Sequence, residues 1–177
     1  MKPEDLAALP KDTLVSLLEV CIKSLQTVDG LWFREVEDSH GLQEATRIDR
    51  KVWERLAISE AQRLKKALGL EGNDLATVMK ALDWNPSWMA FGAFESEQLS
   101  SKEAVFRSTD CLSQKRRLNQ GRSLFPCKEV GEPYFRNFAQ ALNPKIEVRC
   151  EVAPPDNHRE DLWCQWRFTL EEPEEAT

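Results

Sequence analysis

Five cysteines are the residues of this sequence with the most reactive side chains, and four of them fall in its second half. Cys111 follows Asp110 at the start of an expected helix, where the N-terminal amides would lower a thiol pKa and favour a nucleophile. Asp110 opposes that shift, and a structural thiol at a strand-to-helix turn is the alternative interpretation. Cys127 lies in a turn beside the positive charge of Lys128. Cys111 and Cys127 are therefore the candidate nucleophiles.

Two further cysteines, Cys150 and Cys164, fall on the last two expected strands. A symmetric hairpin centred on Asn157 would place them opposite each other, with Cβ atoms about 4.5–5.5 Å apart. That spacing suits a shared metal, a redox bond or a reactive pair, whereas burial as small apolar residues is the alternative. The chain has no C-x-x-C pair of the kind that structural zinc and iron–sulfur sites use. The metal and any other cofactor are left open, with Cys150 and Cys164 as candidate ligands.

Groups that could move a proton are few. His158 lies in a polar loop between the last two strands, near Asp156, and is the candidate proton carrier or metal ligand. A solvated loop histidine is the alternative. The carboxylates of Asp29, Glu37 and Asp38 are interpreted as a solvated helix face, because nothing in the sequence places two of them on opposite sides of a substrate.

Positive charge gathers between residues 111 and 128, a segment with five basic and no acidic side chains. Such a patch suits a carboxylate or phosphate group of a ligand. Lys115, Arg116 and Arg117 would equally complement the C-terminal end of a helix. Arg122 and Lys128 are the better candidates for contact with an anionic ligand.

Tryptophan is frequent here, with six in the chain, and Trp163 and Trp166 fall on the last expected strand. Aromatic rings that line a space between a sheet and its helices form an apolar ligand pocket. Burial in a closed core is the alternative. Trp163 and Trp166 are the candidate aromatic ligand contacts.

The first half of the chain carries apolar residues at three- and four-residue steps, which predicts helices. The expected helices cover residues 14–28, 31–40, 45–68 and 75–84. Asp29 and Gly30 separate the first two, and Gly69 is the expected left-handed cap of the third. The first helix presents an apolar stripe along its whole length, and the third includes Val52 in its stripe.

After Pro86 the apolar period shortens towards two, which predicts strands. Strands are expected over residues 88–94, 104–109, 146–152 and 162–170, and helices over 111–118 and from Gly131 to 142. The predicted fold is α+β, with N-terminal helices packed on a four-stranded antiparallel sheet in the order helices-β-β-α-α-β-β. It forms a single domain over residues 1–170, followed by an acidic tail over 171–177.

Composition narrows the classes of function. The 24 basic and 30 acidic residues give a net charge of −6 and a pI near 5.1, which argues against a nucleic-acid partner. No apolar run approaches the ~20 residues of a membrane helix, and no secretion signal follows the start, so no membrane association is expected. An odd number of cysteines indicates reduced thiols and a cytoplasmic protein. Aromatic residues exposed on the N-terminal helices would offer a homodimer face.

Three segments, over residues 29–33, 121–128 and 150–168, carry a resemblance that covers most of the chain. They contain DGLWF, GRSLFPCK and the strand pair with its double proline. The chain resembles a family of uncharacterised prokaryotic cytosolic proteins that is distantly similar to L-2-amino-thiazoline-4-carboxylic acid hydrolases. Members of that family tend to have a further cysteine before the double proline, where this chain has Ala153. Its element order is also similar to the 4-vinyl reductase domain and the TRAPP tethering subunits, whose helix-covered sheet holds an apolar ligand pocket.

Two functions are expected. The first is a cytosolic small-molecule-binding or sensing domain, with an apolar pocket and a basic rim at Arg122 and Lys128. The alternative is a cysteine-dependent hydrolase of a small C–N bonded substrate, resembling amidohydrolases, with Cys111 or Cys127 as nucleophile and His158 as proton carrier. The first is preferred because a catalytic thiol needs a base within reach and the chain has only two histidines.

Overall fold

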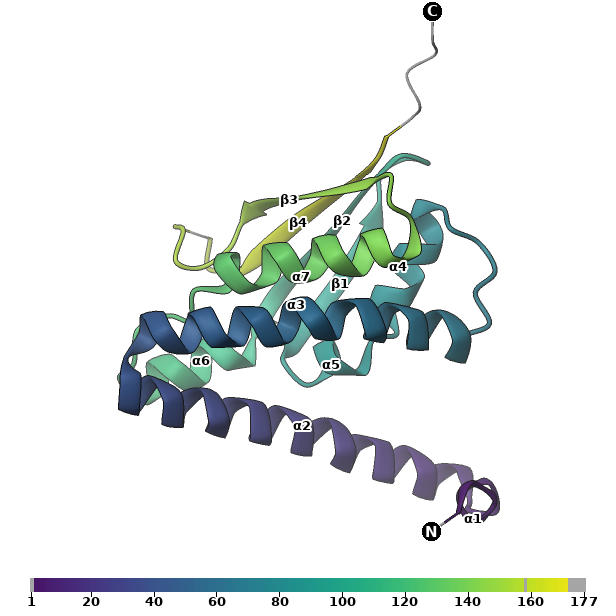
Figure 1. The fold of residues 1–177 in the computed structure, drawn as a ribbon, viewed down its shortest axis with the longest axis horizontal. Coiled ribbons are helices and arrows are strands. Elements are labelled where there is room, and N and C mark those ends of the chain that lie inside the picture. Colours follow the sequence, from purple (N-terminus) through teal and green to yellow (C-terminus); the bar gives the residue numbers. More distant parts are fainter. Residues whose placement is uncertain (1, 158, 172–177) are drawn as a thin grey trace, which may run out of the picture.

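Helices and an antiparallel sheet form two layers, and the long helix α2 lies outside them against the helical layer (Figure 1). The computed structural model describes residues 2–157 and 159–171. Its elements are α1 (Pro3–Ala7), α2 (Lys11–His40), α3 (Leu42–Ala67), α4 (Leu75–Asp83), α5 (Pro86–Met89), β1 (Gly92–Gln98), β2 (Glu103–Cys111), α6 (Leu112–Asn119), α7 (Cys127–Leu142), β3 (Ile146–Val152) and β4 (Cys164–Leu170).

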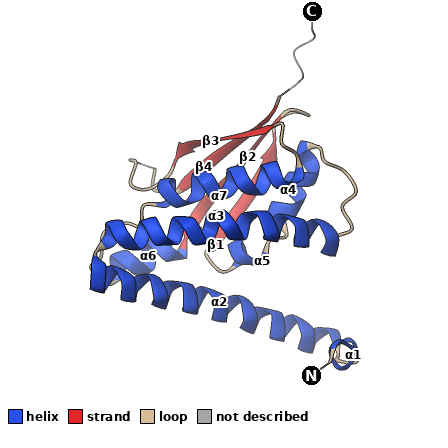
Figure 2. Ribbon diagram, in the orientation of Figure 1, coloured by secondary structure: helices blue, strands red, loops and turns tan. Residues whose placement is uncertain are grey.

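The four strands form one sheet in the order β1-β2-β4-β3, and every neighbouring pair is antiparallel. Helices α3 and α7 cover one face of this sheet (Figure 2). The predicted α+β fold and its order of helices and strands are therefore confirmed. None of the helices that the structure describes has the length and apolar character needed to cross a membrane.

Several helix boundaries differ from the prediction; Cys111, expected in the first turn of a helix, is the last residue of β2 and precedes α6. Helix α2 runs without a break through Gly30, because one glycine in a helix interior costs only about 1 kcal/mol. Helix α5 occupies part of an expected strand, since the Asn85 side chain caps it and Pro86 starts it. Helix α7 begins at Cys127 and contains Pro133, whose lost hydrogen bond is outweighed by the apolar face that the helix buries.

The register of the last hairpin contradicts the predicted pair of thiols. Cys150 lies opposite Trp166, and Cys164 lies opposite Ser108 of the neighbouring strand β2. The observed register is shifted by two residues from the predicted one, because Cys150 pairs with Trp166 instead of Cys164. A shift by two residues keeps the alternation of side chains, so both cysteines remain on the expected face. The error arises because the loop between the strands is not symmetric about Asn157 and the register shifts between Cys150 and Val152.

The core lies between the sheet and helices α3, α4 and α7. Its largest fully buried side chains include Trp166, Tyr134, Phe106 and Phe135. Helix α7 approaches the sheet closely at Gly131, where an added Cβ would lie 2.7 Å from Cζ2 of Trp166. A glycine at this position therefore lets the helix pass directly over the indole ring.

The two long helices bury less than their sequences predict. On α3 the buried stripe runs through Trp53, whereas Val52, the expected member, is 51% exposed. On α2 the expected apolar stripe faces solvent: Leu18 is 50% and Val28 63% exposed, and only Phe33 is fully buried. The α1 end of α2 lies away from α3 (Figure 1), and most of that stripe is exposed.

Candidate ligand site

A cavity of about 340 Å³ lies where α2, α3, α5, α6, α7 and the sheet meet. This volume falls in the range of small-molecule sites, which are concave and largely apolar. Its walls are mostly apolar and rich in aromatic rings, including Trp53, Trp88, Phe91, Tyr134, Phe135 and Trp166. The cavity is thus bounded by both layers of the fold.

Four of these rings form a continuous wall from α3 to β4. Trp53 stacks on Trp88 with ring centroids 6.2 Å apart, and Trp88 stacks on Phe135 at 5.0 Å. Phe135 contacts Trp166 at 4.9 Å. Within the described part of the chain the buried Trp166 indole N–H has no oxygen or nitrogen acceptor, and it lies beside the weakly accepting Cys164 thiol.

A buried hydrogen-bond network fixes the part of this wall that α5 contributes. The fully buried Asn85 side chain donates to Glu60 and to the Tyr134 hydroxyl, both at 3.0 Å. The Tyr134 hydroxyl in turn donates to Glu60, and the Ser87 hydroxyl donates to the other oxygen of Glu60. Trp88, in the same short helix, is held in position by these bonds.

The structure brings Cys111, Cys127 and Cys164 into the cavity wall. Cys111 was expected to have a lowered pKa, and that expectation is wrong. Backbone N–H groups of Ser113 and Gln114 at the start of α6 do lower the pKa of Cys111, but burial outweighs them and raises it. Cys111 is therefore a protonated thiol at neutral pH.

The remaining thiols of the second half are also protonated. Burial holds the pKa of Cys127 well above its usual range, and raises the pKa of Cys164 to about 12 and that of Cys150 to about 11. Cys150 does not line the cavity. Among residues 2–157 and 159–171, no group of three His, Cys, Asp or Glu side chains could hold a metal ion, and His158 lies outside the described residues.

Two carboxyl groups line the cavity from neighbouring helices, that of the half-buried Asp29 from α2 and that of the buried Asp49 from α3. Burial raises the pKa of Asp29 to about 6. Burial and then the charge of Asp29 raise the pKa of Asp49 to about 8. A hydrogen bond from the Trp53 side chain lowers both pKa values, by less than burial raises them. The interpretation of Asp29 as part of a solvated face is therefore wrong.

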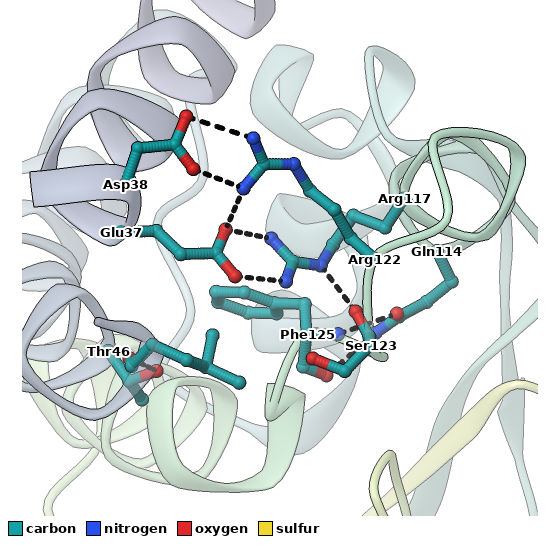
Figure 3. Close-up of polar contacts among 9 residues, drawn as sticks. Glu37, Asp38, Thr46, Gln114, Arg117, Arg122, Ser123 and Phe125 are labelled. Atoms are coloured by element: carbon teal, nitrogen blue, oxygen red, sulfur yellow. Dashed lines mark hydrogen bonds and ion pairs between the residues drawn. The ribbon is translucent and has the colours of Figure 1, made fainter.

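Eight residues further along α2, Glu37 meets two arginines (Figure 3). Arg117 donates two hydrogen bonds of 2.8 Å to its carboxylate, and this contact lowers the pKa of Glu37. Arg122 pairs with Asp38 at 2.7 Å and with Glu37 at 3.1 Å. Arg122 does not line the cavity, so its predicted contact with an anionic ligand is replaced by ion pairs with α2.

Gln114, which the sequence did not single out, holds the loop after α6 against the cavity. Its fully buried side chain donates to the Phe125 carbonyl at 2.8 Å and accepts from the Phe125 amide at 2.9 Å (Figure 3). The same side-chain nitrogen lies 3.0 Å from the Cys127 sulfur. This contact positions Cys127 as part of the cavity wall.

The other predicted ligand contacts lie outside the cavity wall. Lys128 forms an ion pair of 2.7 Å with Asp156, so the expected basic rim at this position is neutralised. Trp163 is partly buried, and its backbone amide donates to the Ser108 carbonyl. Of the two candidate tryptophans, only Trp166 lines the cavity.

Residues 7–170 match a protein family of unknown function, DUF6125. The chain belongs to this family. The match contains every residue of the cavity wall, from Gln26 to Trp166. A comparison with curated proteins finds no match.

The most informative cavity residue of this DUF6125 chain, Asp49, does have a signal in the sequence. The buried face of α3 repeats every four residues through Ala45, Asp49, Trp53, Ala57 and Ala61. An acidic residue in the middle of such an apolar ladder indicates a buried carboxyl group. Placing Val52 on the buried face hides this signal, because it rotates the apparent stripe away from Asp49.

Proposed function

We propose that the protein is a cytosolic small-molecule-binding domain whose ligand occupies the aromatic-walled cavity between α2, α3 and the sheet. The observation that carries this proposal is an open space of about 340 Å³ inside a domain whose core is otherwise filled by large side chains. Protein interiors normally leave few voids larger than a water molecule. Arg122 and Lys128 are not part of the proposal, because carboxylates pair with both.

A neutral fluorescent probe, N-phenyl-1-naphthylamine, tests this proposal. Its fluorescence rises in apolar surroundings, and bound probe should also receive excitation energy from Trp53 and Trp88 in the wall. We expect a saturable rise for the wild-type protein. The Gly30→Phe variant should weaken binding by about tenfold or more, a loss of about 1.4 kcal/mol, because Gly30 lines the cavity and an added Cβ there meets nothing within 4 Å.

Gly30→Ala is the matched control, since it adds only a methyl group at the same position. Its binding should stay within about twofold of the wild type, a difference of about 0.4 kcal/mol. Absence of saturable binding to the wild type would refute the proposal. Equal binding by the wild type and Gly30→Phe would place the probe outside this cavity.

The alternative, a cysteine-dependent hydrolase, keeps one supporting observation: Cys111 and Cys127 both line the same cavity. Their raised pKa values argue against it, because the thiolate is the nucleophile. Thiol titration with a disulfide reagent separates the two functions. The binding proposal predicts that Cys21, which is exposed, reacts fastest in the folded protein. A faster reaction at Cys111 or Cys127 would favour the hydrolase.

A further inference from the structure

A second property of the cavity concerns the charge of its ligand, and it rests on the proposed function. We infer that the ligand is an apolar organic cation, an amine whose ammonium group lies against Asp29 and Asp49. The two carboxyl groups come from different helices and line the same cavity. No lysine or arginine of the described residues donates a hydrogen bond or forms an ion pair with either of them.

Asp49 is the more buried member of this carboxyl pair. Asp49 is only 5% exposed and lines the cavity, and among the described residues the hydrogen bond that lowers its pKa comes from the Trp53 side chain. A buried carboxylate without a cation is costly, so such a group either keeps a proton or acquires a positive partner. An ammonium group in the cavity would supply that partner.

The walls next to the carboxyl pair suit the rest of such a ligand. Trp53 lies beside both carboxyl groups and stacks on Trp88 with ring centroids 6.2 Å apart. Indole faces attract cations that approach within about 6 Å, and aromatic walls also bind the apolar part of a ligand. An ammonium group on an apolar body would therefore meet the carboxyl pair, while its apolar part lies against the aromatic walls of the same cavity.

Three arginines also line the cavity and would favour the opposite charge. Arg117 is committed to Glu37 by two hydrogen bonds. The positive charge of Arg34 lowers the pKa of Asp38, and Arg116 is exposed in the last turn of α6. Cys127, which also faces Asp49, is an uncharged thiol. The preferred charge of the ligand therefore depends on whether the carboxyl pair or the arginines have the stronger effect in the cavity. An experiment can separate these two effects.

The experiment compares three ligands of nearly equal size: phenylbutylamine, phenylbutanol and phenylbutanoate, each with its functional group at the chain end. Titration calorimetry at neutral pH measures their affinities for the wild type, Asp49→Asn and Asp12→Asn. Asp12 is exposed, so its variant makes the same change of charge outside the cavity. We expect the amine to bind about tenfold or more tightly than the alcohol and the carboxylate. Asp49→Asn should remove this preference, and Asp12→Asn should retain it.

The outcomes separate the two proposals. If the alcohol binds in the cavity as tightly as the amine, or if Asp49→Asn keeps the amine preference, the inference of a cationic ligand is wrong while the binding function stands. Tighter binding of the carboxylate would assign the preference to the arginines instead. Competition of each ligand with N-phenyl-1-naphthylamine reports whether it occupies the cavity. If none of the three binds and the probe also fails, both proposals fall.

Discussion

Two acidic clusters that include residues of α2 have opposite electrostatic states: Glu37 belongs to the first, and Asp29 forms the second together with Asp49 of α3. At Glu37 the guanidinium of Arg117 completes the cluster, and the pKa of the carboxyl group is lowered. At Asp29 and Asp49 burial meets no positive partner, and both pKa values are raised. The comparison teaches that burial alone does not decide the state of a carboxyl group on this helix; the presence of a cation does.

The two clusters therefore have different roles around the cavity, which Asp29 and Asp49 line and Glu37 does not. The Glu37 cluster joins α2 to α6 and to the loop that follows it, so it fixes the position of α2 over the cavity (Figure 3). The Asp29–Asp49 pair holds no other element through a charge. A carboxylate cluster whose cations come from the protein stabilises the fold, whereas carboxyl groups without such a cation are available to a ligand.

The largest effect is expected at Arg117. Arg117→Met removes the guanidinium that lies over the Phe33 ring and, among the described residues, leaves the Glu37 carboxylate with only the longer contact to Arg122. Removing one partner of a buried ion pair costs about 3–5 kcal/mol. Urea unfolding of the variant should show a loss of stability in that range.

The double variant Arg117→Met/Glu37→Gln is the control, because it removes both charges. It should recover at least half of the loss, since no buried charge is left unpaired. A double variant as unstable as the single one would mean that Arg117 acts through packing rather than through charge, and the proposed contrast between the clusters would lose its basis.

The second effect is a pH dependence at Asp49. The pKa of Asp49 rises from 3.8 to about 8 in the folded protein, so the folded state holds a proton that the unfolded chain releases. The resulting stabilisation is fully present below pH 3.8 and is lost as pH rises through about 8. Asp49→Asn should flatten the fall of the unfolding free energy between pH 5 and 7 by up to about 1.4 kcal/mol per pH unit.

Urea unfolding at several pH values in this interval measures that slope. Asp12→Asn should run parallel to the wild type, because Asp12 is exposed. If Asp49→Asn and the wild type give parallel lines, the Asp49 carboxyl group is not protonated in the folded protein, and the comparison with Glu37 collapses.

The third effect concerns Gly30, which lies beside Asp29 on the cavity side of α2. Gly30→Ala should raise the stability by about 0.5–1 kcal/mol, because alanine is the better helix former and the added Cβ has open space around it. Thermal unfolding measures the gain. A loss of stability instead would show that α2 moves at Gly30, so that the Asp29 cluster is less fixed than the Glu37 cluster.

The sequence predicts the fold well because periodicity is a local property. Apolar residues recur at every second position in the strand over residues 146–152 and at three- or four-residue steps in the helix from 45 to 68. The structure confirms both elements. The apolar stripe of α2 misleads, since an amphipathic pattern shows that a face could be buried but not that another element reaches it. The homodimer face expected there remains a prediction.

The site is less accessible to sequence reasoning, because it depends on contacts between distant residues. Arg117 meets Glu37 across 80 positions of chain, and neither residue indicates the other. The pairing of Cys150 depends on the path of a loop, which a symmetric hairpin misrepresents. The burial of Asp49 could have been predicted, because its four-residue spacing from Ala45 and Trp53 places it on the buried face of α3.

The smallest effect is expected at Arg122, which sharpens the contrast within the Glu37 cluster itself. Its principal partner, Asp38, has a side chain that is 55% exposed, so water already solvates the pair. Arg122→Ala should therefore cost far less stability than Arg117→Met, and less still in high salt. Glu37 keeps both hydrogen bonds from Arg117 in this variant, so no buried charge loses its cation. Urea unfolding at low and high salt measures the difference. A loss as large as that of Arg117→Met would show that the cluster needs both arginines, and that exposure does not set their relative contributions.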